Sequence, residues 1–218
     1  MLRPQVAIID YGMGNVLSVA RAFEYCGADV SCTRNVQEIF SATHIILPGV
    51  GAFKSAMQAL EEYNLIDVIP KVVEEGKPFM GICLGMQLLF SESEEFGSTR
   101  GLNIMQGEVV SIPAISNDGT RLRVPHIGWA SLNAEDSLTS FGSGLLPEIS
   151  KFDSVYFAHS FQVKPTHKET IKATYSYGDN SIVAVVEKNN VLGCQFHPEK
   201  SGKVGLKIVA HFLEKGAL

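Results

Sequence analysis

The stretch 77–90 constrains the fold most, because it joins two short apolar runs through a cysteine flanked by glycines. The run before Cys83 predicts a buried strand, and the run after it predicts a buried helix. Gly81 and Gly85 lie two residues before and after Cys83, in a Gly-x-Cys-x-Gly pattern. A nucleophile on a sharp strand-to-helix turn needs glycines there, because side chains would collide around the strained backbone. The pattern therefore predicts a nucleophile elbow.

Two features of this turn suit a reactive thiol. A cysteine at a helix N-terminus feels the positive end of the helix dipole, which favours the thiolate form. The backbone N–H of Leu84 follows Cys83 directly and can bind an oxyanion that develops beside the nucleophile. Free cysteines are also among the most buried residue types, so Cys83 could instead be structural. A partner base decides between the two interpretations.

The segment 191–201 supplies a candidate base. His197 follows an apolar strand pattern, and Pro198 holds the preceding residue extended. Glu199 lies two residues beyond His197 along this stiff path, so both side chains can turn to the same side. A histidine that is oriented by a carboxylate and faces a thiol is the arrangement of a catalytic triad. The sequence therefore predicts a triad of Cys83, His197 and Glu199.

Two other histidines compete for this role. His126 follows Pro125 in a predicted turn, and His159 follows a strand predicted at 155–158. Either histidine could be structural or could line the cleft. Taken alone, the His-Pro-Glu segment would be interpreted as structural, but in combination with the elbow it favours His197 as the base.

Strands and helices alternate in the first part of the chain. Strands are predicted at 5–10, 28–33 and 43–47, and helices at 16–25, 52–63 and 65–75. Such alternation predicts a doubly wound parallel sheet with helices on its faces. Asn15 is a candidate cap for the first helix.

The second part changes to short strands separated by turn residues. They are predicted at 107–112, 121–125, 154–157, 170–177, 181–187 and 191–196, and a closing helix at 201–215. The expected fold class is therefore α/β, with an open mixed, mainly parallel sheet flanked by helices and an antiparallel extension. A chain of 218 residues, 45% of them hydrophobic, can bury one core, so we expect a single domain over 1–218.

Composition excludes several classes of partner. The net charge is −5 and there is no basic run, which argues against nucleic acid and anionic membranes as partners.

The four cysteines form no Cys-x-x-Cys pair and no disulfide framework, and Cys26, Cys32 and Cys194 are expected to be small core residues. With no signal-peptide pattern and no run long enough to cross a bilayer, a cytoplasmic, reduced location is expected.

Two glycine turns follow predicted strands. The turn at 11–15 lacks the third glycine of a dinucleotide-binding fingerprint, so a nucleotide site there has little support. The turn Pro48-Gly49-Val50-Gly51 follows the third predicted strand. Ligands in open α/β sheets bind outside such strand ends, and glycines there expose backbone N–H groups. Taken alone, this second turn is better interpreted as an ordinary tight turn.

Three of these motifs occur in one order, at 48–51, 81–87 and 195–199. Together they resemble the class I, or triad-type, glutamine amidotransferases over essentially the whole chain. The stretches 10–15, 125–129, 156–160 and 199–202 resemble, within that family, the glutaminase subunits of imidazole glycerol phosphate synthase.

The resemblance implies a role for each motif. Cys83 would attack the side-chain amide of L-glutamine, His197 would act as base and then as acid, and Glu199 would orient His197. The oxyanion hole would be the N–H groups of Leu84 and of Val50, the latter after its peptide turns over. The residues implied to bind the substrate are Gly49, Gly51, Gln87, Glu95, Ser160 and Phe161. Glu95 would otherwise belong, with Glu92 and Glu94, to a solvated acidic face.

The resemblance also implies a heterodimer with a (β/α)8-barrel cyclase subunit. Four residues would face that partner: Asn15, Trp129, Tyr156 and Lys200. Ammonia would travel through a channel to a ribulose-phosphate substrate, giving imidazole glycerol phosphate and AICAR in histidine biosynthesis. No cofactor and no metal are implied.

The chain departs from the family pattern at two positions. Ala130 stands where the family usually has Asn, and Phe161 stands where Tyr is common. Both lie in the region expected to meet the partner or the substrate. Three alternatives stay open: a paralogue that supplies ammonia for bacterial surface-polysaccharide sugars, a non-catalytic regulatory subunit of the same fold, and a thiol hydrolase or peptidase with the same elbow.

Overall fold

The computed structural model describes residues 3–134, 144–147, 150 and 153–215. Its largest sheet has the strand order β2-β1-β3-β4-β14-β13-β12-β9. Its parallel part comprises β1 (Gln5–Ile9), β2 (Asp29–Thr33), β3 (His44–Gly49), β4 (Phe79–Cys83) and β14 (Val191–Cys194). Its antiparallel extension comprises β13 (Asn180–Lys188), β12 (Ile171–Tyr177) and β9 (Asn133–Ala134). This mixed sheet confirms the predicted fold class.

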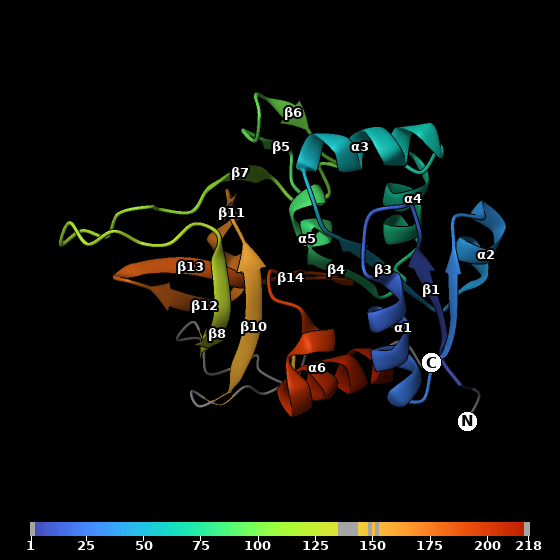
Figure 1. The fold of residues 1–218 in the computed structure, drawn as a ribbon. Helices are drawn as coiled ribbons and strands as arrows, with labels where there is room; N and C mark the ends of the chain where they lie inside the picture. Colours follow the sequence, from blue (N-terminus) through green and yellow to red (C-terminus); the bar gives the residue numbers. More distant parts are fainter. Residues whose placement is uncertain (1–2, 135–143, 148–149, 151–152, 216–218) are drawn as a thin grey trace.

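Helices cover both faces of the sheet (Figure 1). On one face lie α1 (Val16–Tyr25) and α6 (Gly202–Glu214), and on the other lie α3 (Phe53–Glu62), α4 (Val68–Glu74) and α5 (Leu84–Leu88). The short helix α2 (Val36–Ser41) adds Ile39 to the core on the α3 side. Every residue of β3 and β4 is buried, as expected for central parallel strands covered on both faces.

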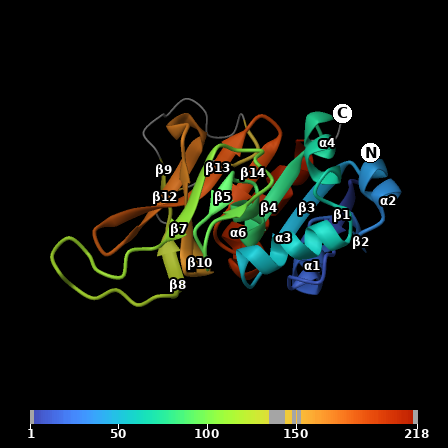
Figure 2. The same ribbon diagram turned by 90° about the horizontal axis from the view of Figure 1, so that it is seen from above.

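Two smaller sheets contact the antiparallel extension, one through β12 and the other through β13. One pairs β8 (His126–Ser131) with β10 (Ser154–His159), and the other has the order β11 (Phe161–Pro165), β7 (Gly107–Ser111), β5 (Glu92–Ser93), β6 (Thr99–Arg100). The single turns η1 (Lys168–Thr170) and η2 (Pro198–Lys200) complete the elements. The loop between β7 and β8 projects away from the helices in both ribbon views (Figures 1 and 2).

Three predictions from the sequence were wrong in detail. The segment 121–125 forms no strand in the part of the chain that the structure describes: Arg121 makes only an isolated bridge to Ile115, because this segment folds back on its own loop. His126 does not lie in a turn but begins β8 and is buried. Among the cysteines expected in the core, Cys194 is buried, but Cys32 is exposed on the edge strand β2 and Cys26 is half-buried.

The sheet register brings the predicted motifs to one edge. Gly49 at the end of β3 pairs with Cys83 at the end of β4. The adjacent strand β14 ends at Cys194, three residues before His197. Because the carboxyl ends of parallel strands meet at the same edge, the glycine turn, the elbow and the histidine segment converge there.

Candidate active site

Cys83 occupies a strained turn between β4 and α5. Its φ of +55° and ψ of −111° lie where few residues other than glycine are found. A Cβ atom at Gly81 would lie 2.8 Å from the carbonyl oxygen of Gly85, and one at Gly85 would collide with the carbonyl of Leu47. Both glycines are therefore required by the close approach of the backbone, as the elbow pattern predicts.

His197 and Glu199 form a buried pair beside the elbow. Nδ1 of His197 lies 2.8 Å from Oε1 of Glu199, and their side chains are only 5% and 2% exposed. The backbone N–H of His197 donates to the carbonyl of Tyr156 at 2.9 Å, and the Ser201 hydroxyl donates to the carbonyl of His197 at 2.7 Å. The turn that carries the imidazole is thereby tied to β10.

The surroundings of His197 favour its charged form. Burial lowers its pKa, but hydrogen bonding and charge interactions with Cys83 and Glu199 outweigh burial and raise the pKa to about 9. Oε2 of Glu199 is buried and has no hydrogen-bond partner among the described residues, so the carboxylate acts chiefly on the imidazole. Since Nδ1 donates to Glu199, Nε2 is the nitrogen that interacts with Cys83.

A pocket of about 170 Å³ opens beside the thiol. It is lined by Val50, Gly51, Cys83, Leu84, Gln87, Glu95, Pro125, Ala158, His159, Ser160 and Phe161. Every residue that the resemblance assigned to the substrate or to the oxyanion hole is in this lining except Gly49. A Cβ at Gly49 would approach the Tyr11 hydroxyl and Leu84, so this glycine is needed for packing behind the pocket.

Glu95 does not belong to a solvated face. It is half-buried at the pocket, and its Oε2 accepts a hydrogen bond of 2.6 Å from the backbone N–H of Phe53, at the start of α3. Glu92 and Glu94 are exposed, as the acidic-face interpretation predicted. A carboxylate at the pocket wall can bind the ammonium group of an amino-acid ligand.

The sequence did not assign Pro125 or Ala158 to the site, and it left open whether His159 is structural or lines the cleft. For His159 a signal was available, because alternate residues of β10 are buried and His159 is in phase with Val155 and Phe157. Pro125 and Ala158 reach the pocket by the packing of β8 and β10 against the elbow, and no local pattern in the sequence reports that packing.

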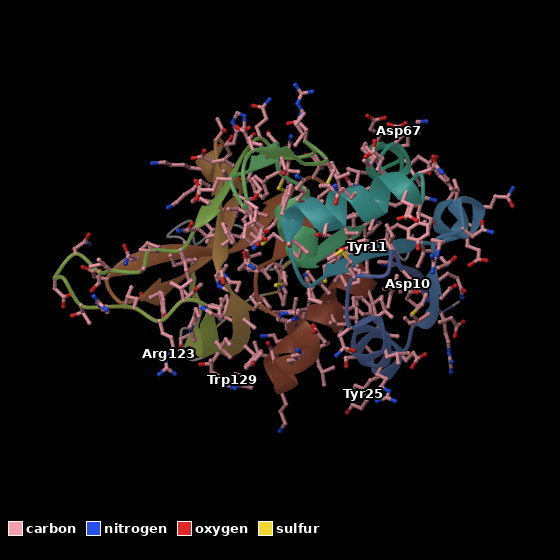
Figure 3. The ribbon with its side chains drawn as sticks, turned by 45° about the horizontal axis from the view of Figure 1, so that its top comes forward. Asp10, Tyr11, Tyr25, Asp67, Arg123 and Trp129 are labelled. Atoms are coloured by element: carbon pink, nitrogen blue, oxygen red, sulfur yellow. The ribbon has the colours of Figure 1, made fainter. Side chains whose placement is uncertain are left out.

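The residues assigned to a partner lie outside the pocket. Trp129 is 58% exposed and meets Tyr156 edge-on, with ring centroids 6.0 Å apart, and Nζ of Lys200 lies 5.9 Å from the Tyr156 ring centroid. Figure 3 shows Trp129 at the margin of the molecule. Asn15 is exposed and caps α1, since its side chain accepts from the Ser18 N–H at 3.3 Å.

Across the described ranges, the His, Cys, Asp and Glu side chains form no group of three or more that could hold a metal ion. The described part of the chain contains no helix that is long and apolar enough to cross a membrane.

The family model of class I glutamine amidotransferases matches residues 7–215. The chain is 46% identical to imidazole glycerol phosphate synthase subunit HisH 1 of Legionella pneumophila (strain Paris), over 96% of this chain and 98% of that protein. It is 45% identical to subunit HisH of Geobacillus thermodenitrificans (strain NG80-2), over 95% and 94% of the two chains.

Solved structures share the fold at low sequence identity. A glutamine amidotransferase superposes with a TM-score of 0.69 at 20% identity, over 98% of this chain and 99% of that chain. PurLQS of Thermotoga maritima gives a TM-score of 0.70 at 21% identity, over 98% and 99%. The chain belongs to the class I glutamine amidotransferases and, within them, to the HisH subunits of imidazole glycerol phosphate synthase.

Proposed function

We propose that the chain hydrolyses L-glutamine to glutamate and ammonia through a thioester on Cys83. The observation that carries this proposal is the strained Cys83 elbow, which faces a pocket and lies next to the buried His197–Glu199 pair. A thiol, an imidazole and an orienting carboxylate are the groups that nucleophilic acyl transfer needs.

The reaction proceeds in two steps. The sulfur of Cys83 attacks the carbonyl carbon of the glutamine amide, while the N–H groups of Val50 and Leu84 stabilise the oxyanion. His197 gives its proton to the leaving nitrogen, the C–N bond breaks, and ammonia departs. His197 then takes a proton from water, which attacks the thioester carbonyl, and glutamate leaves as the sulfur is released. Glu199 keeps the imidazole oriented through both steps.

The pocket walls account for recognition of the amino-acid end of glutamine. The Glu95 carboxylate is the group that pairs with the α-ammonium. Gly51, Gln87, Ser160 and Phe161 complete the wall around the substrate. A substrate that lacks the α-ammonium is therefore expected to bind poorly.

We further propose that ammonia passes to a (β/α)8-barrel cyclase partner, which uses it to make imidazole glycerol phosphate and AICAR in histidine biosynthesis. The names of the HisH relatives support a role as one subunit of that synthase. The exposed Trp129, which meets Tyr156 edge-on beside Lys200, has the composition of an interface anchor. Asn15 completes the proposed partner face.

The two departures from the family pattern fit this assignment. The Ala130 side chain packs against the buried core, so it is directed inward, whereas its neighbour Trp129 is exposed. At Phe161, the backbone carbonyl makes the hydrogen bonds that are seen at the pocket, and a phenyl ring leaves these bonds in place. Neither departure favours the surface-sugar paralogue.

The test is a glutaminase assay of the purified chain, alone and with the barrel cyclase, with and without the ribulose-phosphate substrate. We expect low activity alone and strong stimulation when both partner and ligand are present. High turnover without the partner would contradict the expectation that the partner controls glutaminase activity. A partner of another kind, or no response to the ligand, would assign the chain to surface-sugar synthesis.

A further inference from the structure

A hydrogen-bonded network lies behind the pocket and meets at the carbonyl oxygen of Phe161. This oxygen is 3.1 Å from Nε2 of Gln87 and 2.8 Å from Nδ1 of His159. A backbone carbonyl can only accept, so both neighbours must donate to it. The Phe161 carbonyl therefore determines the orientation of the Gln87 amide and the tautomer of His159.

One branch of the network leads to the nucleophile. Nε2 of Gln87 also donates to Oε1 of Gln195 at 3.1 Å, and Nε2 of Gln195 lies 3.8 Å from Sγ of Cys83. Gln195 is fully buried, and Gln87 is 5% exposed. Because Oε1 of Gln195 accepts from Gln87, its amide nitrogen must face the sulfur. The side chain of Gln195 thus presents an N–H donor to Cys83.

The other branch leads away from the pocket to β8. Burial lowers the pKa of His159 to about 4, so its imidazole is neutral at pH 7. Since Nδ1 carries the proton, Nε2 must accept, and the hydroxyl of Tyr175 donates to it at 2.9 Å. The Tyr175 oxygen then accepts from Nδ1 of His126 at 3.0 Å. The direction of every hydrogen bond in this network is therefore set by the Phe161 carbonyl, which can only accept.

We propose that Gln195 is a positioning residue, whose amide N–H holds and stabilises the sulfur of Cys83 in its anionic form. Gln87 and the Phe161 carbonyl keep that amide in its donating orientation. A side-chain amide does not ionise at neutral pH, so it stabilises the anion without competing with His197 for the proton. This inference depends on the proposed role of Cys83 as the nucleophile.

The test is Gln195→Leu, which removes the donor and leaves a side chain of similar volume. The rate at which iodoacetamide alkylates Cys83 is measured against pH, from the mass of the peptide that contains Cys83. The pH of half-maximal alkylation is expected to rise by about one unit in this variant. A hydrogen bond to a charged group contributes roughly the free energy that corresponds to one pKa unit. On the same basis the glutaminase kcat is expected to fall about tenfold, with a smaller change in KM.

Gln162→Leu is the matched control, because Gln162 is also buried but lies on β11, outside the network. It is expected to keep the alkylation profile of the unmodified chain. The variant Gln87→Leu supplies a second test. In the combined Gln87→Leu/Gln195→Leu chain, the pH shift should be smaller than the sum of the two single shifts, because both residues act through one donor.

The outcomes separate this inference from the proposed function. If Cys83→Ala is inactive but Gln195→Leu is alkylated with an unchanged pH profile, the role of Gln195 is wrong and the nucleophile stands. If Cys83→Ala keeps its glutaminase activity, the proposed function itself is wrong. Thermal unfolding is compared first, and if Gln195→Leu does not fold, Gln195→Met serves as the donor-free variant.

Discussion

Nδ1 of His197 and Oε1 of Glu199 lie 2.8 Å apart, although the two residues are separated by a single proline. The short turn η2 holds them, and α6 packs directly on it: a Cβ at Gly205 would collide with the carbonyl of Pro198. The helix thereby presses the turn toward the sheet. The histidine–carboxylate pair is part of the packed core, so its geometry exists before any ligand arrives.

Replacing Cys83 by alanine should abolish glutaminase activity. A nucleophile in a triad cannot be substituted by its neighbours, so we expect a loss of at least about a thousandfold. Cys32→Ala is the control, because Cys32 is exposed on the edge strand β2 and does not line the pocket. The measurement is release of glutamate by both variants with the cyclase present. Retained activity in Cys83→Ala would contradict a thioester mechanism.

The stability of the fold should decrease at alkaline pH because of His197. Its pKa is about 9 in the folded chain and about 6.5 when unfolded, so folding favours the protonated form. This contribution, on the order of 3 kcal/mol, is fully present below about pH 6.5 and is lost as the pH rises through about 9. Urea unfolding from pH 6 to pH 10 measures the loss.

The variant Glu199→Gln identifies the source of this pH dependence. Without the carboxylate, the free energy of unfolding should change less between the two pH limits. Glu169→Gln is a matched control, because the His167–Glu169 pair has the same spacing but is exposed, with 3.4 Å between Nδ1 and Oε1. Exposed pairs contribute little, so this variant should behave as the unmodified chain does. Identical profiles for all three proteins would exclude the Glu199 carboxylate as the cause, because Cys83 also raises the pKa of His197.

Glu95→Gln should weaken substrate binding more than it slows chemistry. The amide oxygen introduced at position 95 can still accept from the Phe53 N–H. The variant side chain, however, lacks the negative charge that pairs with the α-ammonium of the substrate. We expect KM to rise about tenfold with a smaller change in kcat. Glu94→Gln is the control, since Glu94 is exposed and bonds to Ser111 instead. Equal KM values for both variants would contradict a role of Glu95 in binding the substrate.

Tyr175→Phe should destabilise the fold and weaken the pocket. It leaves Nε2 of His159 and Nδ1 of His126 without their hydroxyl partner, at a cost of about 1–3 kcal/mol in the free energy of unfolding. Because His159 lines the pocket, kcat/KM should fall several-fold. Tyr177→Phe, which loses only a bond to the Arg123 carbonyl, is the comparison. The free energy of unfolding is measured with urea, and kcat/KM by steady-state kinetics. Equal decreases in both quantities for the two variants would contradict a specific contribution of the hydrogen-bonded network.

Trp129→Ala should weaken binding to the barrel cyclase without affecting the isolated chain. An exposed tryptophan of an interface centre contributes on the order of 2 kcal/mol or more, so we expect Kd to rise at least about thirtyfold. Tyr25→Ala is the control, because Tyr25 is an exposed aromatic at the C-terminal end of α1 and is not among the residues assigned to the partner face. Isothermal titration with the cyclase measures both, and unchanged affinity for Trp129→Ala would relocate the interface.

The sequence by itself determined the elements whose pattern is local. Helix α1 has the predicted bounds and the predicted cap at Asn15, because helical periodicity and capping depend on neighbouring residues. The elbow around Cys83 follows from glycines two residues away, since backbone crowding is a short-range effect. The order of motifs along the chain was sufficient to identify the family.

Only the tertiary structure decided which distant residues meet. Glu95 reaches the Phe53 N–H from 42 positions away, and Gln195 faces Cys83 across 112 positions. The burial of His126 and the loop at 121–125 likewise depend on how β8 packs against its neighbours. Such contacts arise from strand register and packing, which are set by the whole core together, and a single stretch of sequence does not encode them.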